Sequence, residues 1–246
     1  MDSDLFSVSE RVCLVTGASS GLGARFAELL ARRGAKVIGA SRSAAETDHE
    51  NLHHLPCDIT NQEDVSAAFD AAERLFGPID VVINNAGVSQ FARAEETRAE
   101  DLANLLDVNV VGTARVTAEA FKRMRSARRG GAIIHVTSVL AGRSMSGLSG
   151  YAASKAALEH LTRAQGAEWG RHGIRVNAIA PGWFLTGMTQ PHFEKGLDGV
   201  LKSRIPLRRL GEAPDLDGAL LLLASDASRY MTGTVITVDG GFSAAG

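Results

Sequence analysis

The chain has 246 residues, of which 45% are hydrophobic and 22% are charged, and its formal net charge is −2. This composition is ordinary for a globular protein and excludes a disordered chain, and the near-neutral charge gives no attraction to nucleic acid or to an anionic membrane. The longest apolar run, residues 219–224, is too short to span a bilayer, and the acidic first ten residues lack the apolar core of a signal peptide. With two cysteines and no disulfide pattern, the sequence predicts a cytoplasmic protein.

Short β-rich segments alternate with longer helical patterns along the chain. Apolar periodicity predicts helices over residues 21–34, 61–77 and 100–128, with another after Pro214. Several strand segments are apolar on both faces, as strands inside a parallel sheet are. We expect one domain over residues 1–246 of the α/β class: a doubly wound, seven-stranded parallel sheet of the Rossmann type with helices on both faces. The expected strands are residues 12–16, 36–40, 52–55, 80–84, 132–137, 175–179 and 234–238.

A glycine-rich turn joins the first predicted strand to the first helix. The sequence TGASSGLG places Gly17, Gly21 and Gly23 between them. Glycine allows a positive φ and close approach of a ligand to the backbone, and the helix N-terminus behind the turn suits a pyrophosphate. The turn therefore predicts a dinucleotide site, with a tight turn that binds no ligand as the alternative.

Residues 187–209 interrupt the alternation of strands and helices. They follow the carboxyl end of a strand, where ligands bind in such sheets, and we expect them to form a substrate lid. The alternative is a surface excursion without such a role.

The sequence SGYAASKAAL places Tyr151 one helical turn before Lys155. Residues four apart lie on the same face of a helix, so the phenol and the ammonium can point the same way. This spacing alone fits a catalytic couple or an ordinary pair on an exposed helix. The seven histidines show no metal-ligand spacing, and we expect no metal site.

Several motifs occur together in one order. The glycine turn is followed by NNAG at residues 84–87, DVNVVGT around Asn109, VTSV around Ser138, YAASK from Tyr151, and PGWFLT ending at Thr186. In this order the chain resembles the short-chain dehydrogenase/reductase family over nearly its whole length. It resembles 3-oxoacyl-[acyl-carrier-protein] reductases and the sugar- or steroid-type dehydrogenases of that family about equally.

The resemblance implies a catalytic tetrad of Asn109, Ser138, Tyr151 and Lys155. Tyr151 is then the general acid/base, and Lys155, together with an oxidised nicotinamide, is expected to lower the pKa of the phenol. Lys155 also bonds the nicotinamide ribose. Ser138, 13 residues before Tyr151, steadies the substrate oxygen, and Asn109 holds a water near the lysine.

The second predicted strand indicates the cofactor. Where NAD-using members of the family carry an aspartate, this chain has Ser41 followed by Arg42. An arginine accommodates a ribose 2′-phosphate, which a carboxylate would repel, and we therefore expect NADP(H) rather than NAD(H). The alternative is that Arg42 is a solvated loop charge. Asp58 resembles the residue that meets the adenine amino group, with helix capping as its alternative role.

The resemblance extends to a full set of cofactor contacts, with Thr186 and nearby backbone groups on the nicotinamide carboxamide. The expected contacts are Gly17, Ser19, Ser20, Gly21, Leu22, Gly23, Ser41, Arg42, Asp58, Ile59, Asn85, Ala86, Gly87, Tyr151, Lys155, Pro181, Gly182, Phe184 and Thr186.

The expected substrate is a small ketone or secondary alcohol with an apolar flank. Leu140, Met145 and Trp183 are its expected pocket walls beside Ser138 and Tyr151, although Leu140 and Met145 fit core packing equally well. We expect an NADPH-dependent carbonyl reductase. The alternatives are an NAD-dependent alcohol dehydrogenase and a non-catalytic dinucleotide-binding protein. The family usually forms tetramers, so we expect a homotetramer and neither a nucleic-acid nor a membrane partner.

Overall fold

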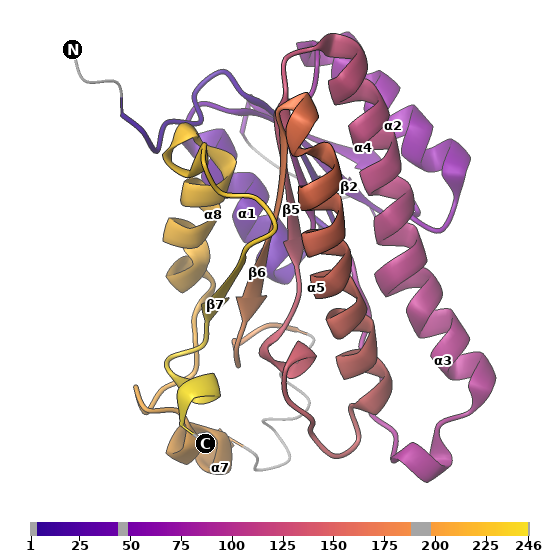
Figure 1. Cartoon of the computed structure of the whole chain (residues 1–246), viewed down its shortest axis with the longest axis vertical. Helices are drawn as coiled ribbons and strands as arrows, with labels where there is room; N and C mark the ends of the chain where they lie inside the picture. Colours follow the sequence, from indigo (N-terminus) through magenta and orange to yellow (C-terminus); the bar gives the residue numbers. More distant parts are fainter. Residues whose placement is uncertain (1–3, 44–48, 188–197, 246) are drawn as a thin grey trace.

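The computed structural model of the protein describes residues 4–43, 49–187 and 198–245. In this part of the chain seven parallel strands form one sheet in the order β3-β2-β1-β4-β5-β6-β7 (Figure 1). The winding direction changes between β1 and β4, and ligands bind outside the carboxyl ends of strands at such a switch point. The seven predicted strands are confirmed, as β1 Val12–Thr16, β2 Lys36–Ser41, β3 Leu52–Pro56, β4 Val81–Asn84, β5 Gly131–Val136, β6 Ile174–Pro181 and β7 Val235–Val238.

Helices cover both faces of the sheet, as predicted. One face carries α1 and α8, and the other carries α2, α4 and α5 (Figure 1). The described helices are α1 Gly21–Arg32, α2 Gln62–Phe76, α3 Ala99–Leu106, α4 Thr113–Ala127, α5 Ser149–Trp169, α7 Asp198–Arg204 and α8 Asp217–Ala224.

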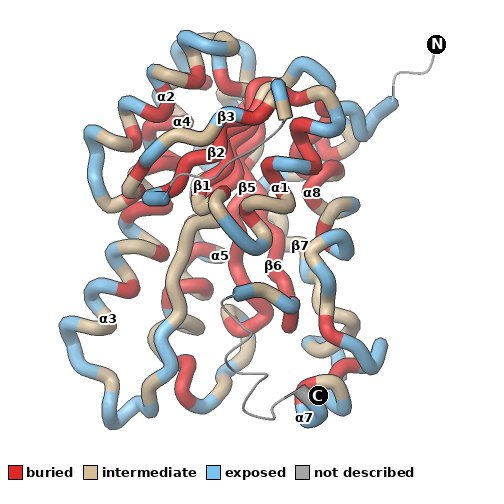
Figure 2. Tube along the Cα trace, turned by 180° about the vertical axis from the view of Figure 1, so that it is seen from behind, coloured by how far each residue is buried: buried red, intermediate tan, exposed pale blue. Residues whose placement is uncertain are grey.

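The core consists of two apolar layers, one on each side of the sheet. Phe26 and Leu30 of α1 pack with Leu220 of α8 on one side, and Phe69 of α2 packs with Met124 of α4 on the other. The central strands between the layers are buried on both faces (Figure 2). Burial on both faces explains why these strands read as continuous apolar runs rather than alternating ones.

Local signals begin and end the helix α2. Asn61 is its N-cap, and the Asn61 side chain accepts hydrogen bonds from the backbone N–H groups of Glu63 at 2.7 Å and Asp64 at 3.2 Å. Gly77 follows the helix with a φ of 92°, a conformation that glycine adopts without strain. The helix predicted over residues 61–77 is therefore confirmed to within its caps.

The helix predicted over residues 100–128 is continuous but not uniform. A π-helical segment, Asp107–Gly112, joins α3 to α4 and contains Asn109. A π turn inserts one extra residue per turn and is rare, often occurring at functional sites. Apolar periodicity does not reveal it, because the sequence on both sides has ordinary helical spacing.

The chain leaves the sheet after β6, and residue 211 returns to lie beside the residues that directly follow this strand. Leu185 N donates to Gly211 O at 3.0 Å, and Gly211 N donates to Trp183 O at 2.8 Å, so residues 183–185 lie beside residue 211. Of the predicted lid over residues 187–209, residues 188–197 lie outside the described part of the chain. The described remainder contains α7, of which Leu201 packs with Ile205 and Trp183.

Candidate active site

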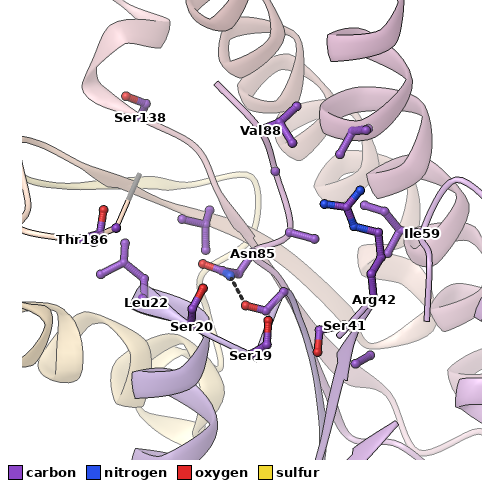
Figure 3. Close-up of a pocket in the computed structure, with 18 of the residues that line it drawn as sticks. Ser19, Ser20, Leu22, Ser41, Arg42, Ile59, Asn85, Val88, Ser138 and Thr186 are labelled. Atoms are coloured by element: carbon purple, nitrogen blue, oxygen red, sulfur yellow. Dashed lines mark hydrogen bonds between the residues drawn. The ribbon is translucent and has the colours of Figure 1, made fainter. Parts of the chain in front are cut away.

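The turn after β1 is held against the turn after β4. Asn85 N and Ala86 N each donate to Thr16 Oγ1 at 3.1 Å, and Asn85 Nδ2 donates to Gly17 O at 3.2 Å, the bond dashed in Figure 3. Gly17 has a φ of 67°, and a Cβ there would lie 2.8 Å from the Cα of Ala86. Glycine is therefore required at residue 17 by both the backbone conformation and the close approach of the two turns.

The N-terminus of α1 opens toward a cavity. Ser20 is the N-cap but its side chain makes no capping hydrogen bond, and the first turn of α1 carries no acidic residue. Ser19, Ser20 and Leu22 line one side of this cavity (Figure 3). The free backbone N–H groups and the positive end of the helix dipole favour an anion here, as a pyrophosphate requires.

Gly23 has a different role from the other turn glycines. It is buried and does not line the cavity, contrary to its expected contact with the cofactor. A Cβ at residue 23 would lie 2.2 Å from Gly17 O and 2.4 Å from Asn85 Nδ2. Gly23 therefore allows α1 to pack directly under the turn, and the sequence motif does not distinguish this role from ligand contact.

The loops after β2 and β3 form one end of the cavity. Ser41, Arg42 and Ile59 lie there together, with Asp58 (Figure 3). Asp58 Oδ1 accepts from Thr60 N at 2.9 Å and from Thr60 Oγ1 at 2.7 Å. These bonds from Thr60 hold the pKa of the Asp58 carboxyl below its usual value. Asp58 thus forms a local turn before α2 and also faces the cavity, so its two predicted roles are compatible.

The cavity has a volume of about 560 Å³ and runs along the carboxyl ends of the central strands. It has the size of a pocket for a small organic ligand. Its wall includes every residue expected to contact the cofactor except Gly23. Ser138 lies at the end opposite Arg42, with Thr186 nearby (Figure 3), and Tyr151 and Lys155 also line the cavity.

Ser138 lies two residues after the end of β5 and faces Tyr151 across this end of the cavity. The Ser138 Oγ accepts from Leu140 N at 3.2 Å, which orients it at the start of a short 3₁₀ turn. Burial raises the pKa of Tyr151 above its ordinary value of 10.0, and a hydrogen bond with the Ser138 side chain opposes this effect. In the chain without a cofactor, burial has the largest effect on this pKa, and its expected lowering by Lys155 together with an oxidised nicotinamide stays a prediction.

Lys155 is buried beneath Tyr151. Its Nζ donates to Val136 O at 2.8 Å and lies 5.6 Å from the centroid of the Tyr151 ring. Burial lowers the pKa of Lys155 to about 8. The predicted alignment of the phenol and the ammonium on one helical face is confirmed, and the two groups are in contact range at the cavity wall.

Asn109 is fully buried and does not line the cavity. Its Oδ1 accepts from Val88 N at 2.8 Å, and its Nδ2 donates to Val88 O at 2.9 Å and to Ser154 Oγ at 3.0 Å. Both side-chain N–H groups are thus used within the protein. Asn109 connects the loop after β4 to α5 close to Lys155, and its side chain has no N–H left with which to hold a water.

The residues expected to form substrate walls lie elsewhere. Leu140 and Trp183 are buried in a separate apolar cluster, against which Met145 packs, and none of the three lines the cavity. Arg143, two residues before Met145, donates to Ser243 O at 2.8 Å. An apolar residue type does not by itself reveal whether the side chain faces a pocket or a neighbouring core.

Sequence patterns missed several polar and apolar wall residues. The additional lining residues include Asn104, Asp107 and Val108, one to two helical turns before or beside Asn109. Helical spacing from Asn109 could have indicated them, but the π segment alters that spacing. Tyr230, the other tyrosine of the chain, is fully exposed and does not line the cavity.

Within residues 4–43, 49–187 and 198–245, no cluster of histidine, cysteine or carboxylate side chains could hold a metal ion. Among the described helices, none combines the length and apolarity needed to span a membrane.

Comparison with known proteins places the chain among dehydrogenases and reductases. A protein-family profile described as Enoyl-(Acyl carrier protein) reductase matches residues 17–243. Gluconate 5-dehydrogenase from Gluconobacter oxydans (strain 621H) is 38% identical over 251 residues, covering 98% of this chain and 97% of that protein. The 3-oxoacyl-[acyl-carrier-protein] reductase of Thermotoga maritima is 36% identical over 240 residues, covering 94% and 97%. The crystal structure of a gluconate 5-dehydrogenase from Burkholderia cenocepacia J2315, in complex with NADP and tartrate, superposes with a TM-score of 0.92 at 31% identity and covers 99% of both chains.

Proposed function

The chain belongs to the short-chain dehydrogenase/reductase family, and on this basis we propose that it is an NADP(H)-dependent oxidoreductase that interconverts a ketone and a secondary alcohol. The observation that carries the proposal is the cavity itself. Ser138, Tyr151 and Lys155 line one end, and the glycine turn and Arg42 line the rest of the same continuous wall. A proton donor and a dinucleotide cradle in one cavity are what such a reaction requires.

The cavity wall fits an NADP dinucleotide. The open N-terminus of α1 suits the pyrophosphate, and Gly17 keeps the turn free of a side chain. Arg42 offers guanidinium donors for a 2′-phosphate beside Ser41, and no carboxylate replaces Ser41 at the end of β2. Thr186 is suited to the nicotinamide end. When bound, the cofactor supplies the hydride.

Side chains of the protein donate the proton and stabilise the phenolate that remains. Tyr151 donates its phenolic proton to the ketone oxygen as negative charge develops there, and accepts it back in the oxidative direction. Ser138 bonds the same oxygen, which fixes the carbonyl against the phenol. The charged form of Lys155 stabilises the phenolate left on Tyr151. Asn109 positions the Val88 backbone and Ser154, which lie beside these groups.

A panel assay tests the proposal. NADPH oxidation is followed with apolar-flanked ketones, a 3-oxoacyl thioester and a keto sugar acid, because relatives include a gluconate 5-dehydrogenase and a 3-oxoacyl-[acyl-carrier-protein] reductase. Tyr151→Phe keeps the ring but removes the proton, and we expect it to lower kcat at least about a hundredfold while NADPH still binds. The proposal would be contradicted if the protein turned over no substrate in either reduction with NADPH or oxidation with NADP. It would also be contradicted if Tyr151→Phe kept the wild-type turnover. The first result would favour a non-catalytic dinucleotide-binding protein.

A sugar-acid dehydrogenase is the second candidate. The similarity to gluconate 5-dehydrogenase supports it, and alcohol oxidation with gluconate and either NADP or NAD distinguishes it from ketone reduction.

We further propose a homotetramer in the cytoplasm. The outer face of α5 carries Ala152, Ala156 and Ala157, each partly exposed, and small residues allow close helix packing. Cys13 and Cys57 are both free and buried, which fits a reducing compartment. Sedimentation at the mass of a monomer would contradict the tetramer.

A further inference from the structure

The chain after β7 forms a compact turn over residues 239–245. The Asp239 carboxylate accepts hydrogen bonds from Gly241 N at 2.8 Å and Ser243 N at 2.7 Å. Gly240 and Gly241 both have positive φ, at 63° and 89°, which lets the backbone fold back on Asp239. The position of the Phe242 ring is therefore set by this turn rather than by a flexible tail.

The 239–245 turn contacts two loops that line the reacting end of the cavity. Arg143 Nη2 donates to Ser243 O at 2.8 Å, and the Arg143 guanidinium lies 5.6 Å from the centroid of the Phe242 ring. The Phe242 ring also meets Trp183 edge to face, with centroids 6.3 Å apart. Arg143 follows Ser138 by five residues, and Trp183 comes directly after Gly182 of the cavity wall.

The same turn reaches Tyr151 through apolar packing. Phe242 and Tyr151 both pack against one cluster, which contains Val139, Leu140 and Trp183. Val139 and Leu140 form the 3₁₀ turn whose backbone N–H at Leu140 binds Ser138 Oγ. A change at Phe242 can thus be transmitted to both Ser138 and Tyr151, although Phe242 does not line the cavity.

We propose that Arg143 and Phe242 are positioning residues, which hold the Ser138 turn and the Tyr151 ring in their relative places for proton transfer. This inference rests on the proposed oxidoreductase function. A displacement of a reacting group by about 1 Å can lower the rate about a hundredfold. Loss of one exposed cation–π contact lowers the stability of the protein only slightly. Substitution of either residue should therefore affect kcat much more than folding.

The test compares this pair with a matched pair elsewhere. Arg125 lies 6.0 Å from the centroid of the Phe121 ring on α4, away from the cavity. We expect Phe242→Ala and Arg143→Gln each to lower kcat about tenfold or more. The Kd of NADPH should stay within about twofold, since neither residue lines the cavity. Phe242→Leu should restore most of kcat, and Phe121→Ala and Arg125→Gln should leave it unchanged.

A second readout does not require turnover. The chain has two tyrosines, so in a Tyr230→Phe background the ultraviolet absorbance change on ionisation reports Tyr151 alone. We expect Phe242→Ala to move this titration down toward the ordinary value of 10.0, because water gains access to the phenol. Phe121→Ala should not move it.

Unchanged kcat and unchanged Tyr151 titration in Phe242→Ala would overturn the inference, as would equal losses in the Phe121 and Phe242 variants. If the wild-type protein turns over no substrate, the proposed function fails, and the Tyr151 titration alone still decides whether Phe242 positions the phenol.

Discussion

The Lys155 ammonium lies 5.6 Å from the centroid of the Tyr151 ring, and the two side chains share one face of α5, with Lys155 buried and Tyr151 partly buried. Burial reverses the order of their two pKa values and moves them apart, since it raises that of the phenol above 10.0 and lowers that of the ammonium from 10.5 to about 8. In a solvent-exposed pair the two groups would lose their protons at nearly the same pH. In this pair the lysine loses its proton first, at a lower pH than the tyrosine.

This order predicts the alkaline limb of the pH profile. As the pH rises through about 8, Lys155 loses its positive charge while Tyr151 keeps its proton. We expect kcat/KM for ketone reduction to fall between about pH 7 and pH 9, which reports the free enzyme. Lys155→Arg stays charged over this range and should lack the limb if it turns over. A wild-type profile that stays flat up to about pH 10 would contradict the assignment to Lys155.

We expect a side chain at residue 23 to clash with the glycine turn and destabilise the protein. Gly23→Ala places a Cβ 2.2 Å from Gly17 O, and backbone on that side cannot move without disturbing the turn. We expect a loss of about 1–3 kcal/mol or more in the free energy of unfolding, measured by urea denaturation, together with weaker NADPH binding. Gly218→Ala in α8 is the matched control, because a Cβ there has no atom within 4 Å and alanine favours a helix. Equal stability of both variants would contradict the close packing of α1 under the turn.

His135 predicts acid sensitivity. Burial, and to a lesser degree the charge of Lys155, lowers the pKa of this β5 histidine from 6.5 to about 4. In the unfolded chain the imidazole takes up its proton near pH 6.5, whereas in the folded protein it stays neutral until about pH 4. Stability is therefore complete above pH 6.5 and falls as the pH drops from there to about 4, by ~3 kcal/mol.

The variant His135→Asn removes this titration. Its free energy of unfolding should fall less between pH 7 and about pH 4 than that of the wild type, whatever its value at pH 7. His160→Asn, at an exposed position of α5, is the control and should keep the wild-type slope. Parallel slopes for wild type and His135→Asn would show that another group governs acid unfolding.

Arg42 predicts the choice of cofactor. Arg42→Asp replaces a guanidinium at the β2 end of the cavity with a carboxylate, which repels a 2′-phosphate and can accept a ribose hydroxyl. We expect the ratio of kcat/KM for NADPH to that for NADH to fall about a hundredfold. Arg74→Asp on the surface of α2 makes the same change in net charge and should leave the ratio unaltered. An unchanged ratio in Arg42→Asp would mean that Arg42 is a solvated charge.

The sequence predicted the sheet well because its strands are buried on both faces. All seven strand segments are present, and β6 is extended at both ends to Ile174 and Pro181 because it pairs with β5 and β7 on either side. The long helix was predicted in extent but not in its π-helical segment, since the extra residue leaves no mark in local composition.

Site residues were predictable where several of them occur together in one sequence motif. Ser19, Ser20, Gly17 and Gly21 of the turn line the cavity, as do Arg42 and the Tyr151–Lys155 pair. The expected cofactor contact of Gly23 stays a prediction, since Gly23 does not line the cavity and glycine serves packing as readily as ligand approach. The expected role of Leu140 and Trp183 as substrate walls also stays a prediction. Both lie in an apolar cluster, and an apolar side chain serves a core as readily as a pocket.

The π-helical segment lets one continuous helix serve two surfaces that an ideal helix could not serve together. Asn104 before it and Asp107 at its start line the cavity, and after it Val116, Ala120 and Met124 face the sheet. Each α-helical residue turns the side-chain direction by about 100°, so the inserted residue resets the rotational phase between the two halves. Deleting one residue within 107–112 would make the helix regular but turn one half away from its surface. This stretch should therefore tolerate changes of residue type far better than changes of length.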